Sequence, residues 1–446
     1  MNKPKLHLTS ERNWMNDPNG LIYYKGKYHA FYQHFPYAPQ WGTMHWGHAI
    51  SDDMVNWTYE PIALFPSKSY DKNGCFSGSA IEVEGDLYLY YTAVKYIETE
   101  EDNTTVPKDN IFESSQAMIF SKDGFNFDNF NDKSLIIPPI MDEELGHYTH
   151  TRDPKVWKYK DNYYMIVGSK VKKSDKEEHT GKLLYYKSKD AKTWEYVNSF
   201  ELHGLGDMWE CPDIFNANDN YILVMSPENY YTDGTYPTNN AVIGIVDFEE
   251  ESCNTKFEKD DFRLVDLGLD YYAPQTFIDK DGRRVQFGWL RMNKPFENHT
   301  WLGMMTLPRV IEVKNKEITT NVHPNISSLF TKEINMDTID NVDFSNPTCI
   351  KATLKDNSKI SIGGYEITFE NNIITTDRSK VFNEEYVNIK ASTPQLKDEC
   401  NIEVYIDYGV IETYINKGQY VISHIVNPLE NKLQIDNVSD LKVYTI

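Results

Sequence analysis

Three carboxylic acids in this sequence stand in settings that could support acid–base or nucleophilic chemistry. Asp17 lies in an Asn-Asp-Pro-Asn-Gly run that would hold it on a rigid turn close to Trp14. Asp153 follows Arg152, whose guanidinium would keep this carboxyl ionised. Glu210 follows a tryptophan, and partial desolvation would let a glutamate keep its proton at neutral pH. Glycoside hydrolysis requires such a pair of carboxyl groups, one ionised and one protonated, across the scissile bond.

Each of these motifs also has an interpretation without chemistry. The runs around Asp17 and Asp153 are common turn sequences, because Asn, Asp, Pro and Gly all favour turns. Near Glu210, Asp213 competes for the role of acid, but it lies further into the expected strand, which favours a structural turn contact. The chemical hypothesis therefore depends on a fold that brings the three acids together.

A hairpin pattern that occurs five times along the chain suggests how distant acids could meet. Each copy has an apolar run, a polar turn such as Lys25-Gly26-Lys27, and a second apolar run. Recurrence at about 60 residues predicts the blades of a propeller, in which the segment before each hairpin returns to the same end of the central axis. We therefore expect an all-β protein with a five-bladed β-propeller. The copies begin at Gly20, Gly78, Asp153, Pro212 and Pro274.

A second repeat supports the blades. Ser51, Ser121 and Ser188 each begin a segment of the form Ser-x-Asp-x-x-x-aromatic. The Asp of such a segment can accept hydrogen bonds from its own backbone in a turn, while the aromatic residue packs between blades. We expect these residues to be structural.

The pattern along the chain also predicts its domains. We expect the propeller in residues 1–320, a linker with a short Pro-opened helix in residues 321–334, and an antiparallel β-sandwich in residues 335–446. Segments such as Asn401–Ile406 alternate apolar and polar residues, which indicates strands with one buried face. The acidic insert from Glu98 to Ser115 has no apolar period, and we expect it to be a surface loop.

The bulk composition argues against several functions. A formal net charge of −22 disfavours binding to nucleic acid or another polyanion. The 31 Tyr and 9 Trp residues favour a β-rich protein with a sugar-binding surface. There is no apolar run of membrane-spanning length and no CxxC pair among the five cysteines, which indicates reduced thiols. We expect a cytoplasmic protein with no membrane partner, and the oligomeric state stays open.

Other common sites find no support in the sequence. His, Cys and carboxylate residues do not cluster at metal-ligand spacing, and neither a Gly-rich phosphate loop nor a Gly-x-Ser-x-Gly elbow occurs. We expect neither a metal nor a cofactor, and a small-molecule sugar as the binding partner.

The sequence resembles glycoside hydrolase family 32, the invertase and fructanase family, along essentially its whole length. The run Trp-Met-Asn-Asp-Pro-Asn-Gly at residues 14–20 looks like the family signature, although Asn13 stands where many relatives have Gly. Any one motif is weakly specific, but a full series in the family's order is very specific. The family fold, a five-bladed propeller followed by a C-terminal β-sandwich, agrees with the repeat pattern. The further matching stretches are Phe31-Tyr32-Gln33, Trp46-Gly47-His48-Ala49, Phe76-Ser77-Gly78-Ser79, Arg152-Asp153-Pro154-Lys155, Glu210-Cys211-Pro212-Asp213, Tyr272-Ala273-Pro274-Gln275-Thr276-Phe277, Gly288-Trp289-Leu290, Thr376-Asp377-Arg378-Ser379 and Ile411-Glu412-Thr413-Tyr414-Ile415-Asn416-Lys417-Gly418.

The resemblance implies a role for each acid. Asp17 matches the nucleophile that forms a covalent fructosyl intermediate, and Glu210 matches the acid/base. Asp153 matches the transition-state stabiliser, which holds fructose hydroxyls. Arg152 would bind hydroxyls and tune the carboxylates, while Cys211 would either adjust the pKa of the acid or simply fill space.

The resemblance also implies a substrate pocket. For Asp270 and Trp289 a structural role is also reasonable, because a strand-end Asp and a buried Trp are ordinary in propellers. The positions that match the family's substrate-binding residues, besides Arg152 and Cys211, are Trp14, Asn16, Gln33, Trp41, Phe76, Ser77, Asp270 and Trp289.

The leading hypothesis is a retaining β-fructofuranosidase that acts on sucrose or sucrose 6-phosphate. The alternatives are exo-acting cleavage of short fructo-oligosaccharides, transfer of fructose to another sugar, and a propeller that binds sugar without cleaving it. Inverting arabinan and xylan hydrolases share a related fold, but the signature at residues 14–20 argues against them. A phosphate on the leaving sugar would need cationic donors at the pocket rim, for which the candidates are Lys170, Lys172, Arg291 and Lys294.

Overall fold

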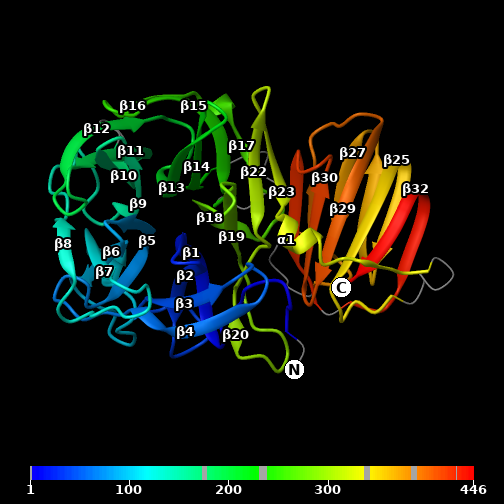
Figure 1. Ribbon diagram of the computed structural model, residues 1–446, viewed down its shortest axis with the longest axis horizontal. Coiled ribbons are helices and arrows are strands. Elements are labelled where there is room, and N and C mark those ends of the chain that lie inside the picture. The colour runs from blue at the N-terminus through cyan, green and yellow to red at the C-terminus, as the bar shows by residue number, and fades with distance from the viewer. Residues whose placement is uncertain (1–2, 173–177, 231–238, 336–341, 383–388, 428) are drawn as a thin grey trace.

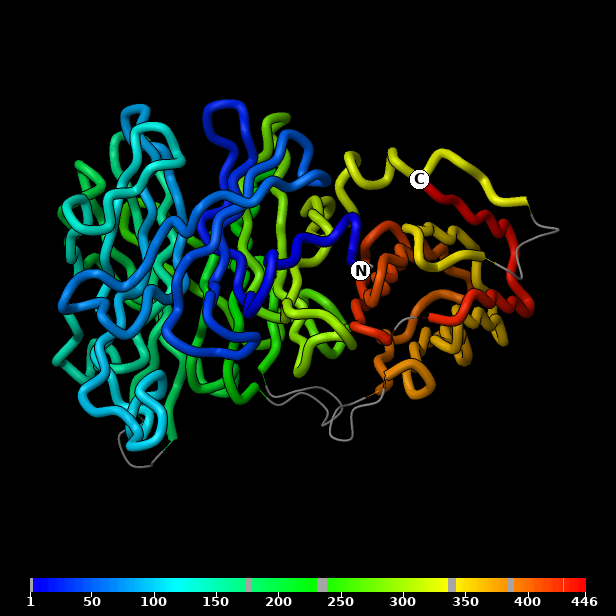
Figure 2. The backbone as a smooth tube through the Cα atoms, turned by 90° about the horizontal axis from the view of Figure 1, so that it is seen from below, coloured from blue at the N-terminus to red at the C-terminus, as the bar shows by residue number. Residues whose placement is uncertain are grey.

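The protein folds into two bodies built almost entirely of β-strands (Figure 1). The computed structural model describes residues 3–172, 178–230, 239–335, 342–382, 389–427 and 429–446. Residues up to Val322 form a propeller, and a sandwich of later residues lies beside it, as Figure 2 shows after a quarter turn. The predicted all-β fold, with five propeller blades followed by a β-sandwich, is confirmed.

In each blade, four neighbouring strands are antiparallel and follow one another along the chain, from the innermost strand at the axis outward. Blade 1 contains β1 (Asn13–Tyr24), β2 (Lys27–Phe35), β3 (His45–Ser51) and β4 (Trp57–Leu64). Blade 2 contains β5 (Gly74–Val83), β6 (Asp86–Tyr96), β7 (Phe112–Ser121) and β8 (Ser134–Ile137). Blade 3 contains β9 (Arg152–Tyr159), β10 (Asn162–Lys172), β11 (His179–Ser188) and β12 (Glu195–Glu201).

The last two blades are less regular at their outer edges. Blade 4 contains β13 (Met208–Ala217), β14 (Asn220–Glu228) and β15 (Val242–Glu249), and β15 pairs with both β16 (Asn254–Lys256) and β17 (Phe262–Leu264). Blade 5 contains β18 (Tyr271–Ile278), β19 (Arg284–Leu290), β22 (Arg309–Lys314) and β23 (Glu317–Val322), with β21 (Met304–Met305) beside β19. The short β20 (Trp301–Leu302) pairs in parallel with β1, so the chain near its fifth blade closes the ring onto the first.

The predicted hairpins are the two innermost strands of the five blades. Their turns need left-handed backbone, which glycine adopts at little cost, as at Gly26 (φ 84°) and Gly282 (φ 83°). A Cβ atom at either glycine would meet nothing within 4 Å. These glycines are therefore required by the turn conformation and not by close packing.

The Ser-x-Asp segments also form the predicted turns. Asp53 accepts hydrogen bonds from the backbone N–H groups two and three residues further on, both at 2.8 Å. Asp123 and Asp190 repeat the arrangement. Trp194, the aromatic residue of the third segment, lies edge-on to Tyr90 of blade 2 at 5.8 Å between ring centroids. The aromatic position therefore packs between blades.

A β-bulge recurs at the same place in the innermost strand of every blade. In each pairing the first strand has one residue more than its partner. Proline, which has no N–H to leave unpaired, follows the bulged residue in every blade except the second. Because a bulge bends the strand and re-aims its side chains, the repeat brings the first four bulged residues into mutual contact. The five bulged residues are Asp17, Ser77, Asp153, Cys211 and Ala273.

In its described residues, the sandwich is one antiparallel sheet of nine strands that folds over on itself. Its long strand β25 pairs with β29 up to Lys355 and with β26 from Ser358 onward, so the sheet changes direction between these residues. The enclosed face is a large aliphatic core. The strands are β24 (Lys332–Glu333), β25 (Thr348–Ile362), β26 (Tyr365–Glu370), β27 (Ile373–Asp377), β28 (Lys390–Ser392), β29 (Glu399–Asp407), β30 (Val410–Ile415), β31 (Tyr420–Ile425) and β32 (Leu433–Thr445).

The domain limits differ slightly from those expected at residues 320 and 335. Strand β23 of the last blade continues to Val322. The predicted Pro-opened helix is present as α1 (Pro324–Ser327), and the His323 side chain caps it by accepting a hydrogen bond from the backbone of Asn325. Strand β24 already pairs with β32 inside the expected linker.

The insert from Glu98 to Ser115 is a surface loop only in its first part. A 3₁₀ turn, η1, spans Lys108–Asn110, and β7 begins at Phe112, so the expected loop was too long. The start of β7 has a polar sequence and was therefore not predicted as a strand. Its residues can be buried because their hydroxyl groups form hydrogen bonds inside the protein. Ser114, for example, donates to the carbonyl of Thr151 at 2.9 Å.

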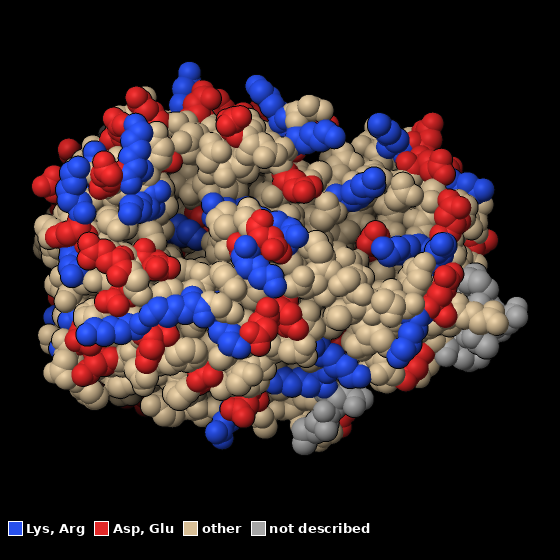
Figure 3. All heavy atoms as spheres, viewed as in Figure 1, with Lys and Arg blue, Asp and Glu red and all other residues tan. Residues whose placement is uncertain are grey.

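The face of the molecule seen in Figure 3 has mixed charge, and the cysteines are unpaired. Lys and Arg are interspersed with Asp and Glu over the face seen in Figure 3, instead of gathering into one basic surface. All five cysteines are free, as predicted. In the described part of the chain, no helix has the length and hydropathy needed to cross a membrane.

Two buried ion networks join the propeller to the sandwich. Arg378 contacts both carboxylate oxygens of Asp270, at 2.5 and 3.1 Å, and the Ile425 N–H donates to the same carboxylate at 2.7 Å. Arg309 of blade 5 forms a second buried ion pair, with Glu412 of β30 at 2.8 Å. The Arg378 and Glu412 motifs of the tail therefore hold the sandwich against the propeller.

We expect Arg378→Met to lower the free energy of unfolding by about 3–5 kcal/mol, because Asp270 would stay buried without its cation. Lys380→Met is the matched control, since Lys380 pairs with Glu366 at the surface and exposed ion pairs contribute little. Differential scanning calorimetry of both variants checks the prediction. Equal losses of unfolding free energy in the two variants would show that the buried ion pair stabilises the protein no more than the exposed one.

Candidate active site

The three predicted acids converge on one pocket of about 230 Å³. Asp17, Asp153 and Glu210 all line it, although they come from blades 1, 3 and 4. Each lies at or next to the bulge of an innermost strand, where these strands contact one another around the axis. The fold therefore supplies the proximity on which the chemical hypothesis depended.

Three donors hold Asp17. The Ser77 hydroxyl donates to Oδ2 at 2.6 Å, and the Asn16 amide donates to Oδ1 at 3.1 Å. The Cys211 thiol lies 3.7 Å from Oδ2. These contacts come from blades 1, 2 and 4, so the carboxylate is fixed from several directions.

Asp153 is held by the strand that carries Glu210. The Cys211 backbone N–H donates to Asp153 Oδ2 at 2.9 Å, and the Cys211 thiol lies 3.6 Å from the same oxygen. Asp153 and Cys211 both have left-handed backbone, at φ 68° and 48°, which is uncommon for residues other than glycine. Such strain is concentrated at functional sites, and here it coincides with the contacts between the bulges.

Glu210 accepts hydrogen bonds at both oxygens. Arg152 donates to Oε1 from Nε at 3.1 Å and from Nη2 at 2.8 Å, and the Tyr272 hydroxyl donates to Oε2. The same guanidinium bridges to Glu228 at 3.0 Å and to His150 Nδ1 at 2.9 Å. Arg152 thus ties the expected acid to the rest of the pocket wall.

Burial raises the pKa values of Asp17, Asp153 and Glu228 in this pocket. The pKa of Asp17 rises to about 6, because burial and the Glu210 charge outweigh the hydrogen bonds from Ser77 and Asn16. Burial also raises the pKa of Asp153, against the effect of Arg152, and the pKa of Glu228. Carboxyl groups this close share protons near neutral pH, so the pocket can present an ionised and a protonated acid together.

Most of the predicted substrate-binding residues line the pocket, and Trp41 packs edge-on against Phe76 at 5.9 Å between ring centroids. Gln33 faces the bulge at Asp17 and donates to the Cys75 carbonyl at 3.0 Å. The predicted residues that line the pocket with the three acids are Asn16, Gln33, Trp41, Phe76, Ser77 and Arg152.

Four predicted residues do not line it. Trp14 and Trp289 pack edge-on against each other, and Trp14 Nε1 donates to Asn16 at 2.6 Å, so these rings support the wall from behind. Cys211 lies between Asp17 and Asp153. Asp270 belongs to the domain interface, where Arg378 and the backbone of β31 occupy its oxygens.

Other residues of the pocket were not predicted. Pro107, Asn110 and Phe112 come from the insert interpreted as a surface loop. Glu228 carries a signal that could have revealed it, since a carboxylate ends the apolar strand β14, and His150 precedes Arg152 by two positions. Tyr96, at the end of β6, completes the set and has no such signal.

The four candidate phosphate donors lie in different settings. Lys170 and Lys172 are at the end of β10, the first half-buried and the second exposed. Arg291 donates to the backbone carbonyls of Asn239, Leu269 and Asp270. Lys294 is exposed.

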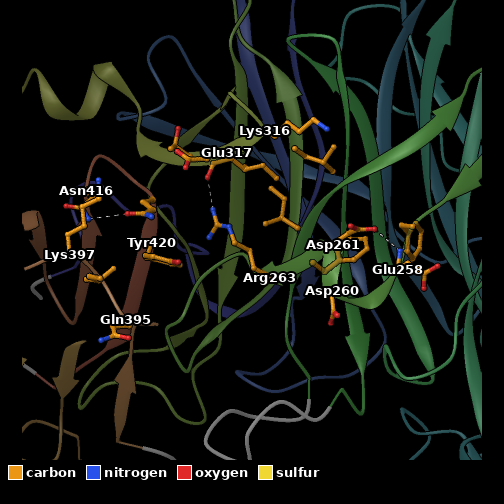
Figure 4. Close-up of a pocket in the computed structure, with 18 of the residues that line it drawn as sticks. Glu258, Asp260, Asp261, Arg263, Lys316, Glu317, Gln395, Lys397, Asn416 and Tyr420 are labelled. Atoms are coloured by element: carbon orange, nitrogen blue, oxygen red, sulfur yellow. Dashed lines mark hydrogen bonds between the residues drawn. The ribbon is translucent and has the colours of Figure 1, made fainter. Parts of the chain in front are cut away.

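A larger cleft of about 1120 Å³ lies between the outer strands of blades 4 and 5 and the sandwich (Figure 4). Arg263 crosses it, donating to the Ile318 carbonyl at 2.8 Å and lying 5.6 Å from the centre of the Tyr420 ring. None of the predicted site residues lines this cleft. The smaller pocket is the candidate active site, because the three acids meet there.

Comparison with known proteins agrees with this geometry. Residues 7–324 match the model for the glycosyl hydrolases family 32 N-terminal domain, and residues 310–444 match the family 32 C terminal model. A sucrose-6-phosphate hydrolase of Escherichia coli is 32% identical over 444 residues, which cover 95% of this chain and 89% of that protein. A sucrose-6-phosphate hydrolase of Bacillus subtilis is 30% identical, over 94% of this chain and 87% of that protein.

Solved structures show the same architecture. A mutant of the Bombyx mori GH32 beta-fructofuranosidase in complex with sucrose has a TM-score of 0.82 and 28% identity, covering 99% of this chain and 93% of that one. The sucrose-6-phosphate hydrolase from Lactobacillus gasseri has a TM-score of 0.81 at 22% identity, covering 100% and 93% of the two chains, and shows the shared fold. Both family models and the curated relatives span nearly the whole sequence, so this chain belongs to glycosyl hydrolase family 32.

Proposed function

We propose that this protein is a retaining β-fructofuranosidase that hydrolyses the terminal β-D-fructosyl linkage of sucrose or sucrose 6-phosphate. The convergence of Asp17, Asp153 and Glu210 in one pocket carries the proposal. The activity named for the Escherichia coli and Bacillus subtilis relatives supports this substrate class.

In the first step Asp17 attacks the anomeric carbon of the fructosyl unit, and the bond from this carbon to the bridging oxygen breaks. Glu210 gives its proton to that oxygen, so the leaving hexose departs as a neutral alcohol. A covalent ester joins Asp17 to fructose. The donors on Asp17, from Ser77 and Asn16, orient the carboxylate for attack.

In the second step Glu210, now ionised, takes a proton from water, and the water oxygen attacks the same carbon. The ester bond breaks and Asp17 leaves as a carboxylate. Each step inverts the carbon, so the product keeps the β configuration.

Asp153 acts on the positive charge that develops on the sugar ring between these states. Its carboxylate is held by the backbone N–H of Cys211 at 2.9 Å and needs no reorganisation as the charge develops. A preorganised carboxylate that accepts hydrogen bonds from fructose hydroxyls stabilises the oxocarbenium-like transition state.

Fructose release from sucrose, sucrose 6-phosphate and a short inulin-type oligosaccharide tests this function, with the first product anomer followed by NMR. We expect efficient cleavage of a sucrose-type substrate and initial release of β-fructofuranose. Initial release of the other anomer would rule out the double displacement. Preference for the oligosaccharide would make the protein an exo-acting fructanase, and no release from any substrate would contradict the proposal.

The pH dependence should reflect the ionisation of Asp17. Its pKa is raised to about 6, and the nucleophile must be ionised, so kcat/KM should fall about tenfold per pH unit below that value. Ser77→Ala removes a donor to the carboxylate, which raises this pKa further and should move the acid limb upward by about one pH unit. Ser79→Ala is the control, because Ser79 lies on the same strand but donates to Pro154. An acid limb of kcat/KM at the same pH in Ser77→Ala as in the parent would contradict the assignment of this limb to Asp17.

We also propose that the reaction takes place in the cytoplasm. Five free cysteines support a reducing compartment, because secreted proteins more often pair their cysteines.

A further inference from the structure

A group of basic side chains, the rim cluster, adjoins one wall of the active site. It consists of His147, His150, Lys170 and His179, from the loop before β9 and from the hairpin of β10 and β11. The ring of His147 lies 4.9 Å from that of His150 and 5.7 Å from that of His179, between centroids. The two segments are tied together, since the His147 N–H donates to Ser169 Oγ at 3.1 Å.

The rim cluster lies on the side of the pocket that contains Glu210. His150 lines the pocket and accepts a hydrogen bond at Nδ1 from Arg152, which also contacts Glu210 and Glu228. Lys170 follows by two residues Gly168, the register partner of Arg152 on β10. Because Glu210 protonates the leaving oxygen in the proposed function, the departing hexose lies next to this cluster.

Hydrogen bonds fix which imidazole nitrogens can donate. His147 Nδ1 accepts from the backbone N–H groups of Thr149 and His150, at 3.0 and 3.1 Å. His150 Nδ1 accepts from Arg152, which can only donate. Each neutral ring therefore carries its proton on Nε2, and no described residue accepts a hydrogen bond from either Nε2 while both stay open to solvent.

Lys170 adds a positive charge for which the described residues supply no ion-pair partner. Within the described ranges, no carboxylate lies within ion-pair distance of its ammonium group, although the side chain is half-buried. Burial lowers the pKa of Lys170, and Asp207 and Glu228 oppose that effect from further away. A ligand with negative charge would offset the desolvation of this ammonium group.

Local cations are needed for an anionic substrate here. The pocket wall contains Asp17, Asp153, Glu210 and Glu228, and the chain as a whole has a net charge of −22. A phosphate dianion that approaches such a pocket is repelled unless donors of opposite charge face it. A metal does not explain the cluster, because the described residues include no group of His, Cys, Asp and Glu able to hold one.

We propose that the rim cluster binds a phosphate group on the leaving hexose and so makes a phosphorylated disaccharide the preferred substrate. This inference rests on the proposed function and names its substrate. It also distinguishes three of the four cations singled out in the sequence. Lys170 belongs to the cluster and Lys172 lies at its exposed edge as the register partner of His179, whereas backbone carbonyls already occupy the donors of Arg291.

The test compares kcat/KM for sucrose 6-phosphate with kcat/KM for sucrose in the full-length protein. The parent should favour the phosphorylated sugar. In the double variant Lys170→Gln and His179→Gln, the ratio of the two values should fall about 10- to 100-fold, as expected for the loss of charge-assisted hydrogen bonds. Lys189→Gln, an exposed lysine in the turn after β11, is the matched control and should keep the parental ratio.

Inorganic phosphate provides a second measurement that does not need the phosphorylated sugar. It should compete with sucrose in the parent, and the inhibition constant should rise by a similar factor in the double variant. Equal losses on both sugars, or an unchanged ratio and inhibition constant, would overturn the proposal. Hydrolysis of both sugars by the parent without preference would refute the phosphate site and leave the fructosidase intact, while hydrolysis of neither would refute the function itself.

Discussion

Replacing Asp17 with Asn should lower kcat for fructose release by about 10⁴-fold or more, as expected for loss of a residue that forms the covalent intermediate. Asparagine has nearly the same shape: its oxygen can still accept from Asn16, and its amide nitrogen can donate to the Ser77 hydroxyl oxygen but cannot attack carbon. Steady-state rates on the best substrate measure the effect. Asp52→Asn is the control, because Asp52 is an exposed carboxylate of blade 1.

The same variant should be more stable than the parent at pH 8. The folded-state pKa of Asp17 is raised to about 6 from its ordinary 3.8, so the folded protein binds the proton more tightly than the unfolded chain. The parent therefore loses stability as pH rises from about 4 to about 6, and an uncharged Asn avoids on the order of 1–3 kcal/mol of this loss. Inactivity with a higher Tm would exclude misfolding. Inactivity with a lower Tm at both pH 5 and pH 8 would leave the role of Asp17 unsupported.

The blades and two of the three acids, Asp17 and Asp153, could be predicted from sequence because they belong to repeated patterns. Hairpin turns such as Lys25-Gly26-Lys27 recur with the period of one blade, and this pattern needs no knowledge of distant contacts. The Asp-Pro and Cys-Pro pairs also repeat, since proline follows the bulged residue at Asp17, Asp153, Cys211 and Ala273. The bulge that joins these residues into one site was therefore already visible in the sequence, although it was interpreted only as a turn.

What the sequence could not predict was set by contacts between blades or between domains. Asp270 stands next to the first strand of blade 5 and was expected in the pocket, but its charge is matched by Arg378, more than a hundred positions away. Phe112 reaches the pocket from a polar segment whose hydroxyl groups are satisfied only in the folded state. Local patterns do not report which of several partners a buried charge or hydroxyl will find.

Replacing Glu210 with Gln should lower kcat/KM for sucrose by about 10³-fold, because the leaving hexose would depart without a proton. The loss should be much smaller for a fructoside with a nitrophenol leaving group, which needs no protonation. This dependence on the leaving group distinguishes an acid from a residue that only binds sugar. Kinetics on the two substrates measure it.

Glu228→Gln is the matched control, because Glu228 shares the Arg152 guanidinium with Glu210. Its loss should be similar on both substrates, since it does not protonate the leaving oxygen. A Glu210→Gln variant with equal losses on both substrates would assign the acid to another residue. Glu228 would then be the first alternative, because burial also raises its pKa.

The contacts of Glu210 explain why its glutamine variant should stay folded and fail only in chemistry. Arg152 donates twice to Oε1, and a glutamine oxygen at that position accepts the same bonds. The amide nitrogen would then face Tyr272, whose hydroxyl can turn to the Ser226 carbonyl, 3.2 Å away. The Tyr272 hydroxyl can rotate in the same way when Glu210 is protonated. It then accepts a hydrogen bond from the protonated Glu210 carboxyl and donates to the Ser226 carbonyl. Tyr272 therefore accommodates both protonation states of Glu210, which an acid/base residue must adopt in every cycle.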